Sequence, residues 1–359
     1  MIRPTAVWLY TPGTPTNTYT DSTDNVRINT VINFLTLTTQ YFYVGSDRRI
    51  EGLYSDLSTN GSYGTVTYEY LNSTQTWVKL SIIDSYSFSE SKYIRWLLPD
   101  KDWSKFAFTD TTPHTAASPD DVERYWIRIS VASVTTAAVI SKLRLIPYAG
   151  YTSPELVSNF LEIKTPFGSA TRPTDLAVED LIHRAEDRID YRTKKSWRFN
   201  AITEDTDPVH VDFNQSGMFL RHRNFYKIYS VKVWGGSDWT TLTEGRTNDY
   251  QVNYNLGLIY LSRLFILPAV YGYNSFNMGE YKNSVKVDYV YGRDSETDSE
   301  FGIVEDLATK MVAVNLLRHH DYSLYTVSGS DKVSLSEKIS NLEEEIEMQL
   351  DEMTGISII

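Results

Sequence analysis

The sequence predicts a multidomain α+β protein in which an all-β sandwich, of jelly-roll or immunoglobulin-like type, precedes a helical bundle with a β insert. Three observations lead to this fold class. Residues 1–150 contain short runs with apolar side chains at every second position, separated by turn-forming residues. A strongly amphipathic helical pattern covers residues 174–197, and two more helical patterns cover residues 301–320 and 334–354. A Tyr-rich segment with strand patterns, residues 201–292, separates the first helix from the other two.

Strand patterns dominate the first 150 residues. Side chains alternate in character along Val66–Tyr70, Ile94–Trp96 and Tyr125–Val131. The stretch Thr111–Asp121 is small and polar, so we expect an exposed loop there. No helical period is evident before residue 150, and a domain built from strands is therefore expected.

The boundary between the two domains is expected near Gly150. Gly, Pro and Ser cluster at both ends of Ala149–Pro173, which is typical of a linker, and Pro154–Ile163 within it is expected to form one short helix. The sequence therefore predicts a β-sandwich domain at residues 1–150, a linker at residues 151–172 and a second domain at residues 173–359.

The second domain is expected to open with the helix at residues 174–197. Its apolar face consists of Val178, Leu181, Ile182, Ala185 and Ile189. The β insert at residues 201–292 follows. Its strand patterns lie at Tyr229–Val233, Tyr250–Tyr254 and Val285–Tyr291, and a turn is expected at Gly235–Asp238.

Two helices are expected to close the sequence. Residues 301–320 carry apolar side chains around much of the helix circumference, so this helix should be the most buried. The helix at residues 334–354 begins with a capping box formed by Ser334 and Glu337. Its apolar stripe has the spacing of a helix that packs along one seam: Leu335, Ile339, Leu342, Ile346, Leu350 and Met353. The apolar residues Ile356, Ile358 and Ile359 come next, and such a segment usually docks on another surface.

The formal net charge is −12, and residues 291–359 alone carry −10. Such an acidic segment argues against direct nucleic-acid binding, because binding to the phosphate backbone requires Lys and Arg side chains that displace counterions. It suits the lining of a channel through which DNA slides, and it also suits a solvated helix face that keeps the protein soluble. The longest apolar stretch, Leu256–Tyr273, contains polar residues and a proline and is too short to span a bilayer, and residues 1–15 have no secretory signal pattern. We therefore expect a protein with no membrane partner.

Aromatic residues are abundant, with 26 Tyr, 14 Phe and 8 Trp. Trp77, Trp96, Trp103 and Trp126 lie on or beside strand patterns. They could form a platform on which sugar rings stack, or they could fill the core and cover the sheet surface. Core packing is the commoner role for Trp beside strands.

Candidate metal and acid–base clusters are weak. The sequence has no Cys, which excludes a disulfide framework and a Cys-based zinc site. His319-His320-Asp321 is the best metal candidate, but adjacent His side chains diverge by about 100° on a helix. A second cluster, of the type that usually forms a solvated helix face, contains His183, Glu179, Glu186 and Asp187. We expect neither a metal nor a cofactor.

Catalytic patterns are equally weak. A glycosidase needs two carboxyl groups that face one bond, and the adjacent carboxyls of Asp120-Asp121 and Glu343–Glu345 do not provide that. The sequence contains no G-x-S-x-G, H-E-x-x-H, EF-hand or P-loop motif. We therefore expect a protein that is not an enzyme.

The second domain resembles a known family in the order of its parts. These parts are an opening helix that ends in TKKSWRF, the strands in Tyr250–Leu261 (YQVNYNLGLIYL), the strand Ser284–Gly292 (SVKVDYVYG) and the helix Phe301–Leu317 (FGIVEDLATKMVAVNLL). In order and spacing they resemble the head–tail connector, or adaptor, proteins of tailed bacteriophages over roughly residues 173–353. Two departures from the family pattern are the long β insert and the sandwich that precedes it.

The resemblance implies a structural virion protein at the neck, assembled in the host cytoplasm. Connectors form rings, typically twelve-fold, that bind the portal protein above and a tail, tail-terminator or completion protein below, while genomic DNA passes through. Fibre or collar proteins are further partners that the N-terminal domain could bind. The resemblance implies that Leu335, Ile339, Leu342 and Ile346 pack against the bundle or a neighbour, and that Ile356, Ile358 and Ile359 insert into a partner. It also implies that four acidic residues face solvent or the channel: Glu343, Glu344, Glu347 and Asp351.

Two alternatives belong to other classes. A carbohydrate- or receptor-binding structural protein would work through the N-terminal sandwich and one of its exposed Trp side chains. An acidic glycoside hydrolase would depend on particular carboxylates, and it is the least favoured reading.

Overall fold

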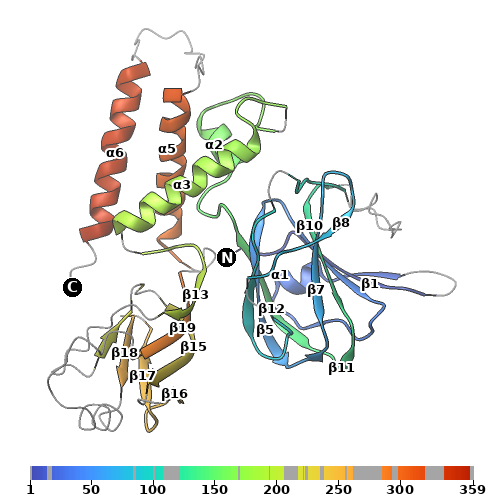
Figure 1. The fold of residues 1–359 in the computed structure, drawn as a ribbon. Coiled ribbons are helices and arrows are strands. Elements are labelled where there is room, and N and C mark those ends of the chain that lie inside the picture. The colour runs from blue at the N-terminus through green and yellow to red at the C-terminus, as the bar shows by residue number, and fades with distance from the viewer. Residues whose placement is uncertain are drawn as a thin grey trace. The chain divides into compact units, whose positions relative to one another are not determined.

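The computed structural model describes residues 2–13, 18–83, 86–99, 102–107, 122–168, 170–193, 195–205, 217–220, 222, 225–234, 238–254, 257–261, 285–292, 298–319 and 335–355. These residues form a mixed α and β fold with mainly antiparallel sheets and five helices (Figure 1). The chain divides into two compact units, Met1–Gly150 and Tyr151–Ile359, which we call unit 1 and unit 2.

Two antiparallel sheets make up most of unit 1. The first has the strand order β2-β1-β4-β10-β7-β8, with β1 (Ala6–Thr11), β2 (Thr18–Asp21), β4 (Tyr41–Ser46), β7 (Val66–Leu71), β8 (Trp77–Lys79) and β10 (Tyr125–Val131). The second has the order β3-β12-β5-β9, with β3 (Ile32–Asn33), β5 (Ile50–Thr59), β9 (Lys92–Arg95) and β12 (Val139–Pro147). The short strands β6 (Ser62–Tyr63) and β11 (Val134–Thr136) pair with each other.

One hydrophobic core joins the two sheets of unit 1. Val44 and Ile127 from the six-stranded sheet are buried in the same cluster as Leu53 and Leu143 from the four-stranded sheet. Alternate side chains of a strand point to the same face, so these residues mark the inner face of each sheet. The strands predicted from the patterns at 66–70 and 125–131 are present as β7 and β10.

Unit 1 also differs from its sequence pattern in one element. Helix α1 (Thr23–Arg27) lies between β2 and β3, where the pattern predicts no helix. It is only five residues long, too short to produce a helical period. The backbone N–H of Thr23 donates to the side chain of Asp21 at 2.8 Å, and Val26 is buried. The backbone N–H of Val7 on β1 also donates to the Thr23 hydroxyl at 2.9 Å, so local and long-range contacts hold this turn and none of them leaves a periodic signal.

Unit 2 combines four of the described helices with two small sheets. The helices are α2 (Pro154–Phe160), α3 (Asp175–Thr193), α5 (Phe301–His319) and α6 (Leu335–Gly355). One sheet has the order β13-β19-β15-β16, with β13 (Asn200–Asp205), β15 (Phe225–Trp234), β16 (Trp239–Leu242) and β19 (Val285–Tyr291). The other has the order β14-β18-β17, with β14 (Gly217–Phe219), β17 (Tyr250–Asn253) and β18 (Leu258–Leu261).

The helices of unit 2 pack into a bundle. Helix α5 contacts α2, α3 and α6, and α6 also contacts α3. Figure 1 shows α5 and α6 side by side with α3 crossing them. Helix α5 is buried around most of its circumference, from Val304 near its start to Leu317 near its end, as its apolar sequence predicts.

Helix α3 ends at Thr193, four residues before the predicted end. The Thr193 hydroxyl donates to the carbonyl of Ile189 and accepts from the backbone N–H of Lys195, which turns the chain out of the helix. Trp197 is then buried, and its backbone N–H donates to the hydroxyl of Tyr151 at 2.7 Å. These side-chain partners replace the helical hydrogen bonds, and residue spacing alone does not reveal them.

Residues 151–172, for which a linker is predicted, form part of unit 2. Tyr151 is fully buried, and its backbone N–H donates to Glu186 of α3 at 2.6 Å. The hydroxyls of Thr152 and Thr309 lie 2.7 Å apart, which ties the segment to α5. Helix α2 begins at the N-cap Ser153 and packs on α5. The segment is therefore anchored to the bundle by side chains that its Gly and Pro content conceals.

The β insert begins and ends at neighbouring positions in the structure. β13 and β15 both pair with β19, so the entering and leaving strands are neighbours in one sheet. At the exit, Gly292 has φ +109°, and a Cβ atom there would lie 2.1 Å from the carbonyl oxygen of Arg198. Only glycine permits this close backbone approach. The insert has its own buried core, which includes Val231, Ile259 and Tyr289.

Candidate partner-binding groove on the helical bundle

A groove of about 490 Å³ runs between α3, α5 and α6. Its lining consists of Arg184, Ala185 and Arg188 from α3, Met311, Val314, Asn315 and Arg318 from α5, and Glu343, Ile346 and Glu347 from α6. The floor is apolar and buried, whereas the rim is charged. We call this site the bundle groove.

The arrangement of the charged side chains at the groove rim follows from helical spacing. Residues four apart lie on one face of a helix, so Arg184, Arg188 and Arg192 form a row along α3. Glu343, Glu347 and Asp351 form a matching row along α6. This complementary spacing is visible in the sequence, although the arginine row is not among the predicted site residues.

The two rows meet across the bundle. Glu347 lies 3.1 Å from Arg188 and 3.0 Å from Arg192, and Arg192 lies 3.5 Å from Asp351. Glu343 pairs with Arg318 of α5. These side chains are partly exposed, so each pair contributes at most about 1 kcal/mol. The pairs therefore set the register of α6 more than they stabilise it.

Arg184 stands apart from this network. Its side chain is exposed at the rim of the bundle groove, and it forms no ion pair with any residue that the structure describes. The groove therefore presents a positive group beside an apolar floor, on a chain whose net charge is −12. An acidic side chain next to an apolar one would complement it.

The residues predicted to bind a partner fall into three groups. Ile346 is buried in the groove floor, as Leu350 and Met353 are buried further along α6. Ile339 and Leu342 are half-buried, so the first half of α6 keeps an accessible apolar edge. The side chain of Leu335 and the residues Ile356, Ile358 and Ile359 lie outside the described residues.

The four acidic residues predicted to face solvent or a channel are not equivalent. Glu344 and Asp351 are exposed, whereas Glu343 and Glu347 are half-buried. Three of the four also pair with arginines of α3 or α5, as described above. Their charges are therefore partly neutralised within the bundle.

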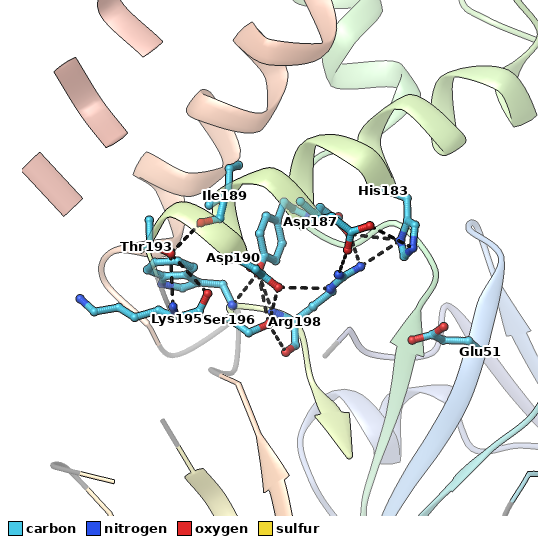
Figure 2. A network of polar contacts seen from close by, with 12 residues as sticks. Glu51, His183, Asp187, Ile189, Asp190, Thr193, Lys195, Ser196 and Arg198 are labelled. Carbon is cyan, nitrogen blue, oxygen red and sulfur yellow. Dashed lines mark hydrogen bonds and ion pairs between the residues drawn. The ribbon is translucent and has the colours of Figure 1, made fainter. Parts of the chain in front are cut away.

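A buried polar network lies where α3 gives way to the β insert, and Arg198 is its centre (Figure 2). The Arg198 guanidinium lies 3.3 Å from Glu186, 3.4 Å from Asp190 and 2.9 Å from Nδ1 of His183, and it also pairs with Asp187. Burial alone would lower the pKa of His183, but the hydrogen bond to Glu186 and the neighbouring carboxylates outweigh it and raise the pKa.

Asp190 and Tyr151 form a second part of this network. Tyr151 donates its hydroxyl proton to Asp190, and Ser196 donates to the other Asp190 oxygen at 2.9 Å. Burial raises the pKa of Asp190 to about 6, and the charge of Arg198 only partly opposes this. These groups are paired with one another, so the network joins the start of unit 2, α3 and the beginning of the insert.

The remaining sequence candidates do not assemble into a site. Within the described ranges, no three His, Asp or Glu side chains gather closely enough to hold a metal ion. The side chain of His319 and the residues His320, Asp321, Asp120 and Asp121 lie outside the described residues. Glu343 pairs with Arg318, whereas Glu345 pairs with Lys310. The two carboxyl groups therefore do not face one glycosidic bond, as a glycosidase would require.

Three of the four tryptophans considered for a sugar platform are buried. Trp96, Trp103 and Trp126 are at most 2% exposed, which fits core packing. Trp77 is half-buried on the outer face of the six-stranded sheet. Trp8, which is not one of these four, is half-buried in the same outer cluster.

Comparisons with known proteins give little further guidance. No family model matches the sequence, and no curated protein matches it. Among solved structures, a chain from the neck of an empty GTA particle, computed with C6 symmetry, is similar over 54% of this chain and 91% of its own length. The identity is 13% and the TM-score 0.27, a value too low to establish a common fold. None of the described helices is long and apolar enough to cross a membrane.

Proposed function

We propose that the protein is a head–tail connector of a tailed-phage-like particle, whose copies form a ring that joins portal to tail. The observation that carries the proposal is the arrangement of unit 2. Helix α3 is followed by a β insert that leaves and returns at one point, and α5 and α6 then pack back on α3. This is the order of parts on which the resemblance to connectors rests. In this proposal unit 1 is a β-sandwich of jelly-roll or immunoglobulin-like type.

In this proposal the protein acts through contacts with other proteins of the particle and catalyses no reaction. The bundle groove and the accessible edge formed by Ile339 and Leu342 contact a neighbouring copy or the portal. Leu335 and Ile346 extend this apolar strip, and Ile356, Ile358 and Ile359 insert into a partner protein. Burial of such apolar side chains at an interface contributes roughly 1.5–3 kcal/mol each.

The acidic side chains have a separate role in this proposal. Glu343, Glu344, Glu347 and Asp351 line the side of the ring that faces DNA or solvent, where like charges keep the phosphate backbone from adhering. The portal protein binds on one side, and a tail, tail-terminator or completion protein binds on the other. Fibre or collar proteins are the partners proposed for unit 1.

Co-expression with the portal protein of the same genome tests the proposal. We expect electron microscopy of the purified complex to reveal a ring of this protein, twelve-fold in the simplest case, stacked coaxially on the portal. The protein alone serves as control. Repeated failure of the chain to co-purify with its own portal would overturn the connector assignment.

A triple substitution tests the apolar segment. Ile356→Ser, Ile358→Ser and Ile359→Ser together should abolish co-purification with the portal and leave the circular dichroism spectrum unchanged. Met348→Ser is the matched control, since Met348 is 63% exposed on α6. If the triple variant binds portal as well as Met348→Ser does, the segment has no docking role.

A further inference from the structure

A continuous chain of aromatic rings crosses the outer face of the six-stranded sheet in unit 1. Consecutive ring centroids lie 5.1 Å apart for Tyr19 and Tyr10, 6.1 Å for Tyr10 and Tyr41, 6.3 Å for Tyr41 and Tyr43, and 5.6 Å for Tyr43 and Trp77. The five rings come from four strands, β2, β1, β4 and β8. We call this feature the aromatic ladder.

The strand register places these rings on one face. Tyr10 is opposite Tyr19 on β2 and opposite Tyr41 on β4, while Trp8 is opposite Tyr43. Residues directly opposite one another, or two apart along a strand, share a face of the sheet. The four ring separations add up to about 23 Å, and the step from Tyr41 to Tyr43 runs along β4 rather than across the sheet, so the end-to-end length of the ladder is shorter than that sum. A chain of several sugar rings could lie along that length.

A charged pair is built into the middle of the ladder. The Arg128 guanidinium lies 4.7 Å from the centre of the Tyr41 ring and 4.6 Å from that of Trp77, so it stacks between them. Glu69, opposite Arg128 on β7, accepts from Arg128 Nε at 2.8 Å and lies 2.7 Å from Nη2. This geometry fixes a donor and an acceptor between two aromatic faces and leaves the pair electrically neutral.

Part of the ladder is the floor of the site and part is accessible. Tyr10 and Tyr43 are buried, whereas Tyr19, Tyr41 and Trp77 are half-buried. Glu69 retains 18% of its side-chain exposure and Arg128 retains 10%. A ligand would therefore meet the exposed parts of Tyr19, Tyr41 and Trp77, on the side of the Tyr41 and Trp77 rings that Arg128 leaves open, and the edge of a held ion pair.

We propose that the aromatic ladder is a binding platform for a neutral oligosaccharide. The C–H faces of a pyranose stack on Tyr and Trp rings, and the hydroxyls at its edge take hydrogen bonds from a guanidinium and give them to a carboxylate. The pairing of Arg128 with Glu69 cancels the charge at the centre, which favours a neutral sugar over a sulfated or phosphorylated one. This activity is independent of ring assembly and belongs to unit 1.

Binding of defined hexasaccharides to the full-length protein tests the platform. The probes are maltohexaose, cellohexaose and chitohexaose, measured by isothermal titration calorimetry and by saturation-transfer NMR. We expect at least one probe to bind, with the strongest saturation transfer to the ring C–H protons of the sugar. Trp77→Ala should weaken that binding by about tenfold or more, in line with the loss of one stacking contact.

A second variant and a control distinguish loss of the binding site from loss of the fold. Glu69→Gln keeps the shape of the side chain and removes its charge, and it should also weaken sugar binding. Trp234→Ala is the matched control, because Trp234 is a half-exposed tryptophan of unit 2 and lies outside the ladder. Absence of binding to all three probes at millimolar concentration, or equal binding by all variants, would overturn the proposal. Binding of a protein ligand instead of any sugar would overturn it as well.

Discussion

Asp190 is a carboxyl of the Arg198 network whose pKa is raised in the folded protein. Its folded pKa of about 6 lies above the ordinary value of 3.8, because burial penalises the charged form. The folded carboxyl therefore binds its proton more tightly than the unfolded one, and protonation favours folding. The stability that Asp190 contributes is complete below about pH 4 and is lost as the pH rises through about 6. The shift corresponds to roughly 3 kcal/mol.

Asp190→Asn removes this titration and predicts a specific pH profile. The difference in unfolding free energy, wild type minus variant, should fall by up to roughly 3 kcal/mol between about pH 4 and about pH 7. Urea denaturation of both proteins across that range measures it. Met348→Ala serves as a control because it changes an exposed side chain that does not titrate. A difference that stays constant with pH would contradict the assignment of Asp190.

Gly292 provides a second test at the residue scale. Gly292→Ala places a Cβ atom against the Arg198 carbonyl in a backbone conformation that disfavours side chains, so it should cost more than about 2 kcal/mol. Gly302→Ala is the matched control, because no heavy atom outside its own helix lies within 4 Å of a Cβ there. In α5 that change should be neutral or stabilise by up to about 1 kcal/mol. Thermal denaturation of both variants distinguishes the two sites.

At the scale of elements, α6 is held by two kinds of contact with different strengths. Leu350 is fully buried, so Leu350→Ala should cost roughly 2–5 kcal/mol. Glu347→Arg should cost only about 1 kcal/mol, since it replaces partly exposed ion pairs by repulsion from Arg188 and Arg192.

A charge-swapped double variant completes the test of α6. Adding Arg188→Glu to Glu347→Arg should recover part of the loss, and the recovery should shrink at high salt. Urea denaturation at low and high ionic strength measures both effects. Equal stability of the single and double variants would show that the two helices do not couple through these charges.

Elements with strong periodic patterns were predictable from the sequence, and elements fixed by particular contacts were not. The strands β7, β10 and β19 and the helix α5 lie where alternation or the helical period predicts them. The end of α3 depends on Tyr151, more than 40 residues away, so no local pattern marks it. Likewise, Trp126 and Arg128 are buried on the outer face of β10 because aromatic residues of other strands cover them.

The candidate groove was predictable only in part. The acidic residues of α6 and its apolar stripe stand out in the sequence, whereas the arginine row of α3 becomes meaningful only when the two helices lie together. A sequence pattern gives the face of one helix. The partner of that face is set by tertiary packing, which the pattern does not contain.

At the scale of the whole molecule, each unit has its own hydrophobic core. Units with separate cores unfold as separate cooperative transitions when their stabilities differ. Ile127→Ala should therefore lower only the transition of unit 1, and Leu350→Ala should lower only that of unit 2, each by roughly 2–5 kcal/mol. Differential scanning calorimetry of the full-length protein measures both. A single transition that both substitutions shift equally would contradict the prediction.

The closeness of the two ends of the β insert has a consequence for how the insert can change in length. Since Arg198 and Gly292 lie against each other, the roughly 90 residues between them begin and end at one point beside the bundle. Insertions with adjoining ends are the kind that a host fold tolerates, because lengthening them does not move the flanking helices. We therefore expect changes in the length of this segment to leave the packing of α3, α5 and α6 intact. The insert is therefore the part of unit 2 whose length can change with the least effect on the bundle.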